Sequence, residues 1–256
     1  MTAVQNKKNF VFPLIFLMLW QLLSSIGVLP PGRIPSPYHI FSAFIELCVT
    51  GLPSGNRLML HCLYSLVRVA GGFIIAAVLA IPFGMILGRS KFLANIFTPV
   101  IELIRPIPPL AWIPLAILWF GIGLKSAVFI IFLGCFFPIV LSTISGVHSV
   151  DTLLVDAAKT LGADERQVFY KVLFPGSFPS IYTGLRIGMG IGWMTLVAAE
   201  FTGVKSGYGV GYMIMTARDI QRPDMVLAGM ITIGLIGYIL DMVLRKSEKQ
   251  ALKWRE

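Results

Sequence analysis

The chain has 256 residues, of which 56% are hydrophobic and only 13% are charged, and its formal net charge is +9 at pH 7. So few polar residues cannot cover a soluble globular protein of this size, and the composition therefore predicts an integral protein of the lipid bilayer. The basic residues are spread over short segments and not gathered in one stripe with aromatics, which argues against a nucleic-acid partner. Three scattered cysteines exclude a disulfide framework and a zinc site, although they leave open a pair between Cys48 and Cys62.

The amino-terminal region, residues 1–62, predicts one membrane span and one short interfacial helix. An apolar run over 10–29 is long enough to cross a bilayer at about 1.5 Å per residue. It resembles a signal peptide only superficially, because it is long, lacks a small-x-small cleavage site and precedes further apolar runs. We therefore expect a retained first helix. After a proline-rich segment, Ser36 is placed to cap a short helix along the outer interface.

Five further apolar runs are long enough to be spans, within a core at residues 63–246 that is followed by a basic tail at 247–256. These runs are 63–87, 92–123, 126–146, 181–204 and 225–244. The run over 92–123 is too long for one straight helix and contains several prolines, so we expect a kinked or interrupted span there. The sequence thus predicts an all-α membrane protein with about six transmembrane helices.

The distribution of basic residues predicts that both termini lie in the cytoplasm, because cytoplasmic segments carry an excess of lysine and arginine. Arg68, near the outer end of the 63–87 run, is expected to extend its side chain to water. The cytoplasmic set is Lys7, Lys8, Arg89, Lys91, Lys159, Arg166, Lys171, Arg186, Arg245, Lys246, Lys249, Lys253 and Arg255. The outer set is Arg33, Arg57, Arg68, Lys125, Lys205, Arg218 and Arg222.

A polar stretch at residues 150–181 interrupts these spans. Apolar residues recur every three or four positions over 150–161, which predicts an amphipathic helix. Gly162 breaks this pattern, Asp164 is placed to cap a second short helix, and Pro175 is expected to end it. A helical hairpin of this size cannot form its own core, so it must bury its apolar faces against the chain's other helices or a partner. An ordinary cytoplasmic loop is the alternative.

The residues of this hairpin resemble a known motif. Asp156-Ala157-Ala158, then Gly162, then Val172-Leu173-Phe174-Pro175 is similar to the EAA motif of the permease subunits of bacterial ABC importers, with Asp, Val and Phe in place of Glu, Ile and Leu. In that family the motif forms the coupling helix, which rests in a groove of the ATPase subunit. The resemblance implies an ATPase-coupling role for Asp156, Ala157, Ala158, Gly162, Ala163 and Pro175.

A narrower resemblance runs from about the second span to the last. The segments that begin at Arg105, Trp119 and Gly184 look like the permeases of taurine, aliphatic sulfonate and nitrate importers, and are most similar to the taurine type. The resemblance implies a type I ABC importer transmembrane domain in a bacterial inner membrane. It also implies a homodimer, two ABC ATPase subunits and an extracytoplasmic solute-binding protein. Taurine or another sulfonate is the expected solute; nitrate, bicarbonate and a thiamine-pyrimidine precursor remain alternatives.

Several features argue against an enzyme. The sequence has no G-x-x-x-x-G-K-[ST] loop, so ATP hydrolysis must come from a separate subunit. His39, His61 and His148 are isolated, and no catalytic or metal-ligating cluster is apparent, so no catalytic residue, metal or cofactor is expected. An intramembrane enzyme would need paired catalytic groups, and a scaffold would not need a broken, charged span.

Ionisable and aromatic residues at membrane depth are the candidates for a translocation path, because charge there is costly unless it is paired or hydrated. Glu102 and Arg105 are placed to form a structural ion pair at the kink or to face a cavity, where Arg105 would attract an anionic sulfonate. Glu200 either meets a residue across the bundle or faces water. The path candidates are Glu102, Arg105, Trp112, Trp193 and Glu200.

Two further patterns have simpler interpretations. Asp241 and Arg245 are four residues apart, so we expect a local helix pair. The glycines over 184–192 allow close helix approach, at a dimer interface or beside the solute path.

Overall fold

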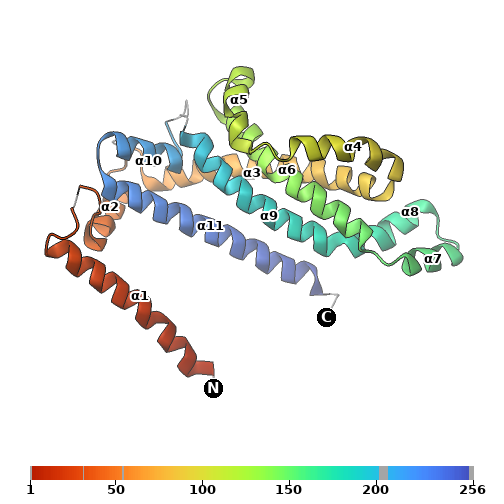
Figure 1. The fold of residues 1–256 in the computed structure, drawn as a ribbon, viewed down its shortest axis with the longest axis horizontal. Coiled ribbons are helices and arrows are strands. Elements are labelled where there is room, and N and C mark those ends of the chain that lie inside the picture. Colours follow the sequence, from red (N-terminus) through yellow and green to blue (C-terminus); the bar gives the residue numbers. More distant parts are fainter. Residues whose placement is uncertain (1, 31, 54, 202–206, 254–256) are drawn as a thin grey trace. The chain divides into compact units, whose positions relative to one another are not determined.

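The computed structural model describes residues 2–30, 32–53, 55–201 and 207–253, with side chains from residue 12 onward. Every regular element in these ranges is helical (Figure 1), as the long apolar runs predict. The chain divides into two compact units, one formed by Met1–Tyr64 with Gly207–Leu235 and the other by Ser65–Ser206 with Ile236–Glu256. The basic residues expected at Lys7, Lys8, Lys205 and Arg255 lie outside the described side chains.

Helices occur at all six places where spans are expected. Three are long and apolar enough to cross a membrane, namely α3 (Leu58–Arg89), α6 (Leu124–His148) and α11 (Pro223–Ala251). A fourth span is the pair of α4 (Lys91–Ile104) with the segment Pro109–Phe120, bent by 84°, which confirms the expected interruption. The remaining two are α1 (Thr2–Ser25) and α9 (Phe174–Phe201). The charged Arg186 and Glu200, together with several glycines, lower the mean hydropathy of α9, which explains why apolarity alone does not identify it.

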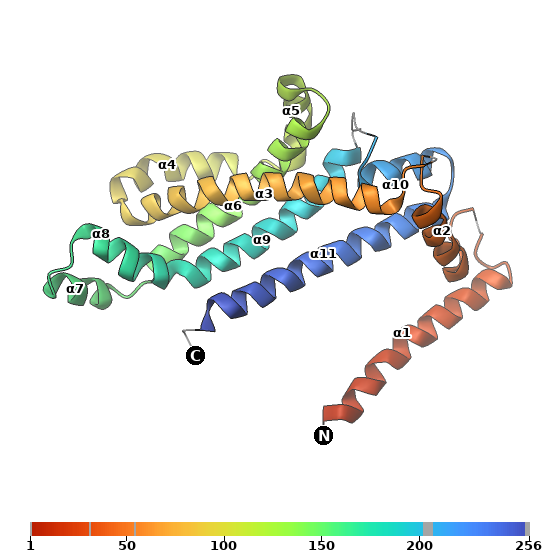
Figure 2. The ribbon, with the colours of Figure 1, turned by 180° about the vertical axis from the view of Figure 1, so that it is seen from behind.

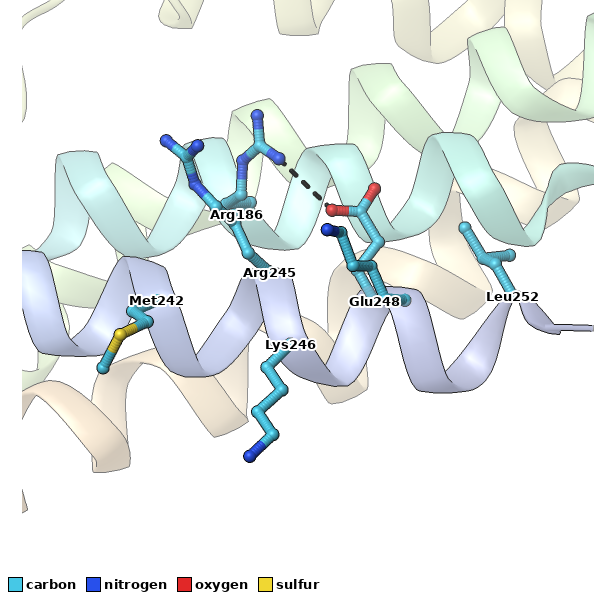
Figure 3. A pocket seen from close by; sticks show the side chains of 7 residues that line it. Arg186, Met242, Arg245, Lys246, Glu248 and Leu252 are labelled. Carbon is cyan, nitrogen blue, oxygen red and sulfur yellow. Dashed lines mark hydrogen bonds and ion pairs between the residues drawn. The ribbon is translucent and has the colours of Figure 1, made fainter. Parts of the chain in front are cut away.

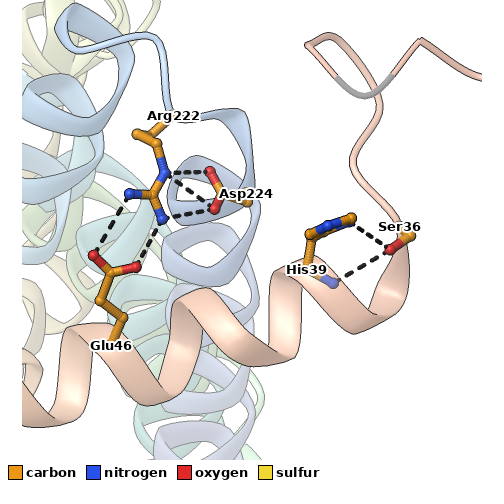
Figure 4. A network of polar contacts seen from close by, with 5 residues as sticks. All are labelled: Ser36, His39, Glu46, Arg222 and Asp224. Atoms are coloured by element: carbon orange, nitrogen blue, oxygen red, sulfur yellow. Dashed lines mark hydrogen bonds and ion pairs between the residues drawn. The ribbon is translucent and has the colours of Figure 1, made fainter.

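In the first unit, α2 (Pro37–Val49) begins where the sequence predicts. The Ser36 side chain accepts a hydrogen bond from the backbone N–H of His39 at 3.3 Å, and this caps the helix. An ion pair of α2 was not expected: Glu46 meets the Arg222 guanidinium at 2.8 Å, and Arg222 also binds Asp224 at 2.8 Å (Figure 4). Hydrogen bonds from Arg222 to Asp224 and to Glu46 raise the pKa of the guanidinium. The network fixes α2 against the turn between α10 (Val210–Asp219) and α11.

No disulfide joins Cys48 to Cys62 within the described residues.

In the second unit, α6 packs against α9 along its length, and both views show the two helices side by side (Figures 1 and 2). Glycines make this approach possible. A Cβ atom on Gly184 would lie 2.6 Å from Cβ of Ser142, and one on Gly192 would lie 2.5 Å from Sγ of Cys135. These glycines of α9 therefore serve packing within the chain. A Cβ atom on Gly190, in contrast, would have no neighbour within 4 Å, so that side of α9 is open.

We expect Gly184→Val to destabilise this helix pair by about 1–3 kcal/mol, because the added carbons would force α6 and α9 apart. Gly190→Val is the matched control on the same helix, with the same change in helix propensity and open space around it. Thermal unfolding of the purified chains in detergent measures both. Equal losses in the two variants would contradict the packing described above.

The hairpin departs from expectation at its second half. The first helix, α7 (Thr152–Thr160), and the break at Gly162, with φ +85°, are as predicted. Asp164 caps α8 (Glu165–Val168) by accepting from the backbone N–H of Gln167 at 2.6 Å, which is also as predicted. Pro175, however, does not end the helix.

The chain instead continues from α8 through a π-helical turn, η2 (Phe169–Leu173), directly into α9. Pro175 lies in the first turn of α9. Proline is tolerated in the first turn of a helix, because its missing N–H would have no intrahelical partner there. The second half of the hairpin is therefore the start of a membrane helix.

Candidate functional site

The apolar face of α7 is uncovered by the rest of the described chain. Leu153, Leu154 and Leu161 are 70%, 58% and 88% exposed, and no residue of α7 is buried. Asp156, Ala157 and Gly162 are also exposed, whereas Ala158, Ala163 and Pro175 are half-buried. Adjacent exposed leucines on one helix face are typical of a surface that binds a partner protein.

The second half of the hairpin is firmly attached to the membrane helices. Val168 is buried, and Phe169 and Leu173 pack on a cluster formed by Met85, Val147 and Ile181. These three residues come from α3, α6 and α9. The second half of the hairpin is therefore packed on three membrane helices.

Glu165 adds a polar attachment that no pattern in the sequence indicated. It forms ion pairs with Arg89, at the end of α3, and with Lys159 of α7, the latter at 3.6 Å. The pairs are exposed, so each contributes little to stability. Their geometric effect is to link both halves of the hairpin to the end of α3.

A cavity of about 310 Å³ lies where the broken span bends. Arg105, which follows the last turn of α4, and Trp112, in the short 3-10 helix η1 (Pro109–Trp112), line it together with Leu133 of α6 and Ile191 of α9. Two of the path candidates therefore meet in one cavity. Glu102 is exposed on α4, and within the described residues no ion pair joins it to Arg105.

A second cleft of about 310 Å³ shares Leu141 with this cavity and is lined by Ser142, Ser145, Ser180 and Thr183. Thr183 donates its hydroxyl to the carbonyl of Pro179 at 3.1 Å. The three serine hydroxyls form no hydrogen bond within the described part of the chain. Together the two hollows follow α6 from Leu133 to Ser145, about 18 Å of helix. The serines were not among the predicted path residues, because isolated serines are common in glycine-rich helices.

Glu200 meets its cation across the bundle, which is one of the two alternatives above. Its Oε1 accepts from Arg68 Nη1 at 2.6 Å and from the Ser65 hydroxyl at 2.8 Å. Glu200 is 0% exposed and Arg68 3%, so the expectation that Arg68 extends to water is wrong. The reason is physical: a carboxylate from α9 is already within reach, and pairing removes the need for hydration.

Trp193 is also interior, with 6% of its surface exposed. Its ring lies 3.1 Å from where a Cβ atom on Gly237 would be, so it packs between α9 and α11. Trp193 and Glu200 line neither of the two hollows.

The overall fold is that of an ABC importer membrane subunit. An inward-facing methionine ABC transporter structure matches with a TM-score of 0.67 at 18% identity, covering 76% of this chain and 95% of that chain. The chain belongs to the family described as binding-protein-dependent transport system inner membrane component, whose profile matches residues 80–251. The predicted family and fold class are thereby confirmed, and the protein is a multi-pass membrane permease.

Curated relatives cover most of the chain. A putative ABC transporter permease of Methanocaldococcus jannaschii is 45% identical and covers 98% of this chain and 94% of its own length. The taurine transport system permease of Escherichia coli is 36% identical, over 94% of this chain and 86% of that protein. A nitrate import permease of Synechocystis sp. is 34% identical, over 89% and 82%.

Proposed function

We propose that the chain forms the translocation path of an ATP-driven importer for a small oxyanion, with taurine or another sulfonate as the solute. The observation that carries this proposal is the Arg105 cavity, which adjoins the serine-lined cleft at their shared Leu141. A guanidinium attracts an anion and fits its oxygens with two parallel hydrogen bonds. The unbonded hydroxyls beyond it offer donors without a fixed charge.

A charged group followed by neutral hydroxyls is an order that suits conduction of an anion. A permeating ion must bind well enough to enter and weakly enough to leave. Arg105 supplies the stronger attraction at the bend, whereas Ser142, Ser145 and Ser180 supply weaker, neutral contacts farther along α6. Taurine and nitrate, named for two of the relatives above, are both small oxyanions or carry such a group.

The energy of ATP hydrolysis reaches the permease through α7. In this proposal two copies of the chain form a homodimer with the path along the two-fold axis, two ATPase subunits bind the hairpins in the cytoplasm, and a solute-binding protein delivers the solute outside. Both termini are cytoplasmic. When the ATPases close, each moves α7, and the continuous α8–η2–α9 segment moves Ser180 and Ile191, which line the path. Glu102 flanks the entrance of the path. Trp193 and Glu200 hold α9 against α11 and α3 and do not line the path.

The test is uptake of radiolabelled taurine into proteoliposomes that contain the permease, its ATPase and its binding protein. We expect Arg105→Gln to reduce uptake at least about 10-fold, the effect of one lost charge-assisted contact, while ATPase activity of the assembled complex persists. Arg218→Gln, at an exposed arginine paired with the adjacent Asp219, is the matched control. Unchanged uptake in Arg105→Gln would remove Arg105 from the path. Uptake of nitrate in place of taurine would keep the oxyanion path and reassign the solute.

A further inference from the structure

A basic groove of about 810 Å³ lies between α9 and the carboxyl-terminal end of α11, away from the two hollows described above. Arg186 of α9 and Arg245 and Lys249 of α11 line it. Figure 3 shows the guanidinium groups of Arg186 and Arg245 on the same side of the groove, while the side chain of Lys246, which also lines it, points away from them.

The groove has more cations than nearby carboxylates to pair with them. Arg186 contacts Glu248 at 3.2 Å and Asp241 at 3.8 Å, and Arg245 contacts Asp241 at 2.7 Å, which confirms the expected local pair. Within the described residues no ion pair involves Lys249. Two carboxylates, Asp241 and Glu248, thus accompany four groove cations, Arg186, Arg245, Lys246 and Lys249, which leaves a net positive charge.

The carboxylates hold the arginines in place. Glu248 and Asp241 fix the position of the Arg186 guanidinium, and the Tyr182 hydroxyl donates to Ser247 at 2.7 Å, which ties α9 to α11 beside the groove. A pre-positioned guanidinium loses less side-chain entropy when it binds an anion.

The chemistry of α11 indicates what kind of anion fits. Tyr238, Met242, Arg245 and Lys249 recur at intervals of three and four, so they share one face of the helix. Tyr238 is 68% and Met242 48% exposed. This face therefore changes from apolar to basic at the end of a membrane span, at the depth where a phospholipid changes from acyl chain to headgroup.

We propose that this groove binds an anionic phospholipid, with the headgroup phosphate on Arg186, Arg245 and Lys249 and an acyl chain along Met242 and Tyr238. The apolar half of the stripe favours a lipid over free phosphate, because inorganic phosphate would gain nothing from Met242 or Tyr238. The inference does not depend on which solute the importer carries.

The test is native mass spectrometry of the permease–ATPase complex, titrated with phosphatidylglycerol or with phosphatidylcholine. We expect one tight phosphatidylglycerol per permease chain and no comparable phosphatidylcholine site. Arg245→Gln/Lys249→Gln should weaken that site about 30-fold, since each basic residue near an anionic headgroup contributes roughly fivefold. Lys253→Gln removes one charge near the same helix end but outside the groove and should leave the site intact.

The charge-preserving pair Arg245→Lys/Lys249→Arg should retain most of the affinity, which separates loss of charge from damage to the fold. A separate arm adds inorganic phosphate at millimolar concentration. If phosphate displaces the lipid equally from wild type and from Met242→Gln, the groove is an oxyanion site and the lipid assignment fails. The assignment also fails if the neutralised pair binds phosphatidylglycerol like wild type, or if the intact complex binds none because a partner covers the groove.

Discussion

Replacing Glu200 with alanine is expected to lower the free energy of unfolding by about 3–5 kcal/mol, the largest of the stability effects predicted for this chain. The substitution removes the carboxylate that Arg68 contacts at 2.6 Å, in a site where both side chains are almost fully buried. A buried guanidinium that loses this partner costs far more than an exposed one, because water cannot replace the contact. Thermal unfolding of the detergent-purified chain measures the loss.

The control is Asp219→Ala, which removes the acid of an exposed pair with Arg218 and should cost less than about 1 kcal/mol. A double replacement, Arg68→Met/Glu200→Leu, tests the explanation further, since removal of both charges should restore much of the stability. If Glu200→Ala unfolds at the same temperature as Asp219→Ala, the buried pair does not hold α3 to α9. If the double variant is no better than the single one, charge burial is not the reason.

This pair also shows what the sequence could and could not predict. Arg68 and Glu200 are separated by 132 residues, and nothing near either of them in the chain indicates the other. Local rules therefore left Glu200 with two alternatives and assigned Arg68 wrongly to water. The same limit applies to Glu46 and Arg222, which are 176 residues apart.

Features that depend on a few consecutive residues were predicted well. Ser36 and Asp164 each accept a backbone N–H three residues ahead, as their positions before helical runs indicate. Gly162 takes the positive φ that a helix break requires. The prolines over 99–114 interrupt the span formed by α4 and Pro109–Phe120, as expected.

Pro175 shows where a local rule fails. Proline ends most helices because it lacks an N–H and crowds the preceding turn. Here Pro175 follows the π turn at Phe169–Leu173 and lies in the first turn of α9, where proline is tolerated, and the packing of the partly buried Phe169 and Leu173 on α3, α6 and α9 stabilises the continuous segment. Tertiary packing decided the outcome, and no periodicity in the sequence records it. The likeness to the EAA motif located the hairpin but not this rigid connection.

The second large effect concerns the exposed leucine face of α7. We expect Leu161→Asp to weaken binding of the ATPase subunit by at least about 30-fold, equivalent to the loss of about 2 kcal/mol at a central contact residue. Leu161 is 88% exposed in the chain, so the change should leave the unfolding temperature of the purified permease unaltered. A carboxylate on the apolar face of α7 would, in contrast, be desolvated without a partner when the ATPase binds. Co-purification of the two subunits and biolayer interferometry measure the affinity.

Thr152→Asp is the matched control, because it adds the same charge to α7 on the side opposite Leu161, in the first turn, where an acidic residue suits the helix dipole. Normal ATPase binding by Thr152→Asp together with loss in Leu161→Asp would locate the contact on the leucine face. Gly162→Val then separates binding from transmission: open space surrounds Gly162, so a side chain there acts only through its strained positive φ. A complex that binds the ATPase normally but no longer couples hydrolysis to uptake would show that the fixed angle between α7 and α8 carries the movement. Normal ATPase binding in Leu161→Asp would instead mean that the exposed leucines of α7 are not the docking surface, and the coupling role proposed for the hairpin would have to be abandoned.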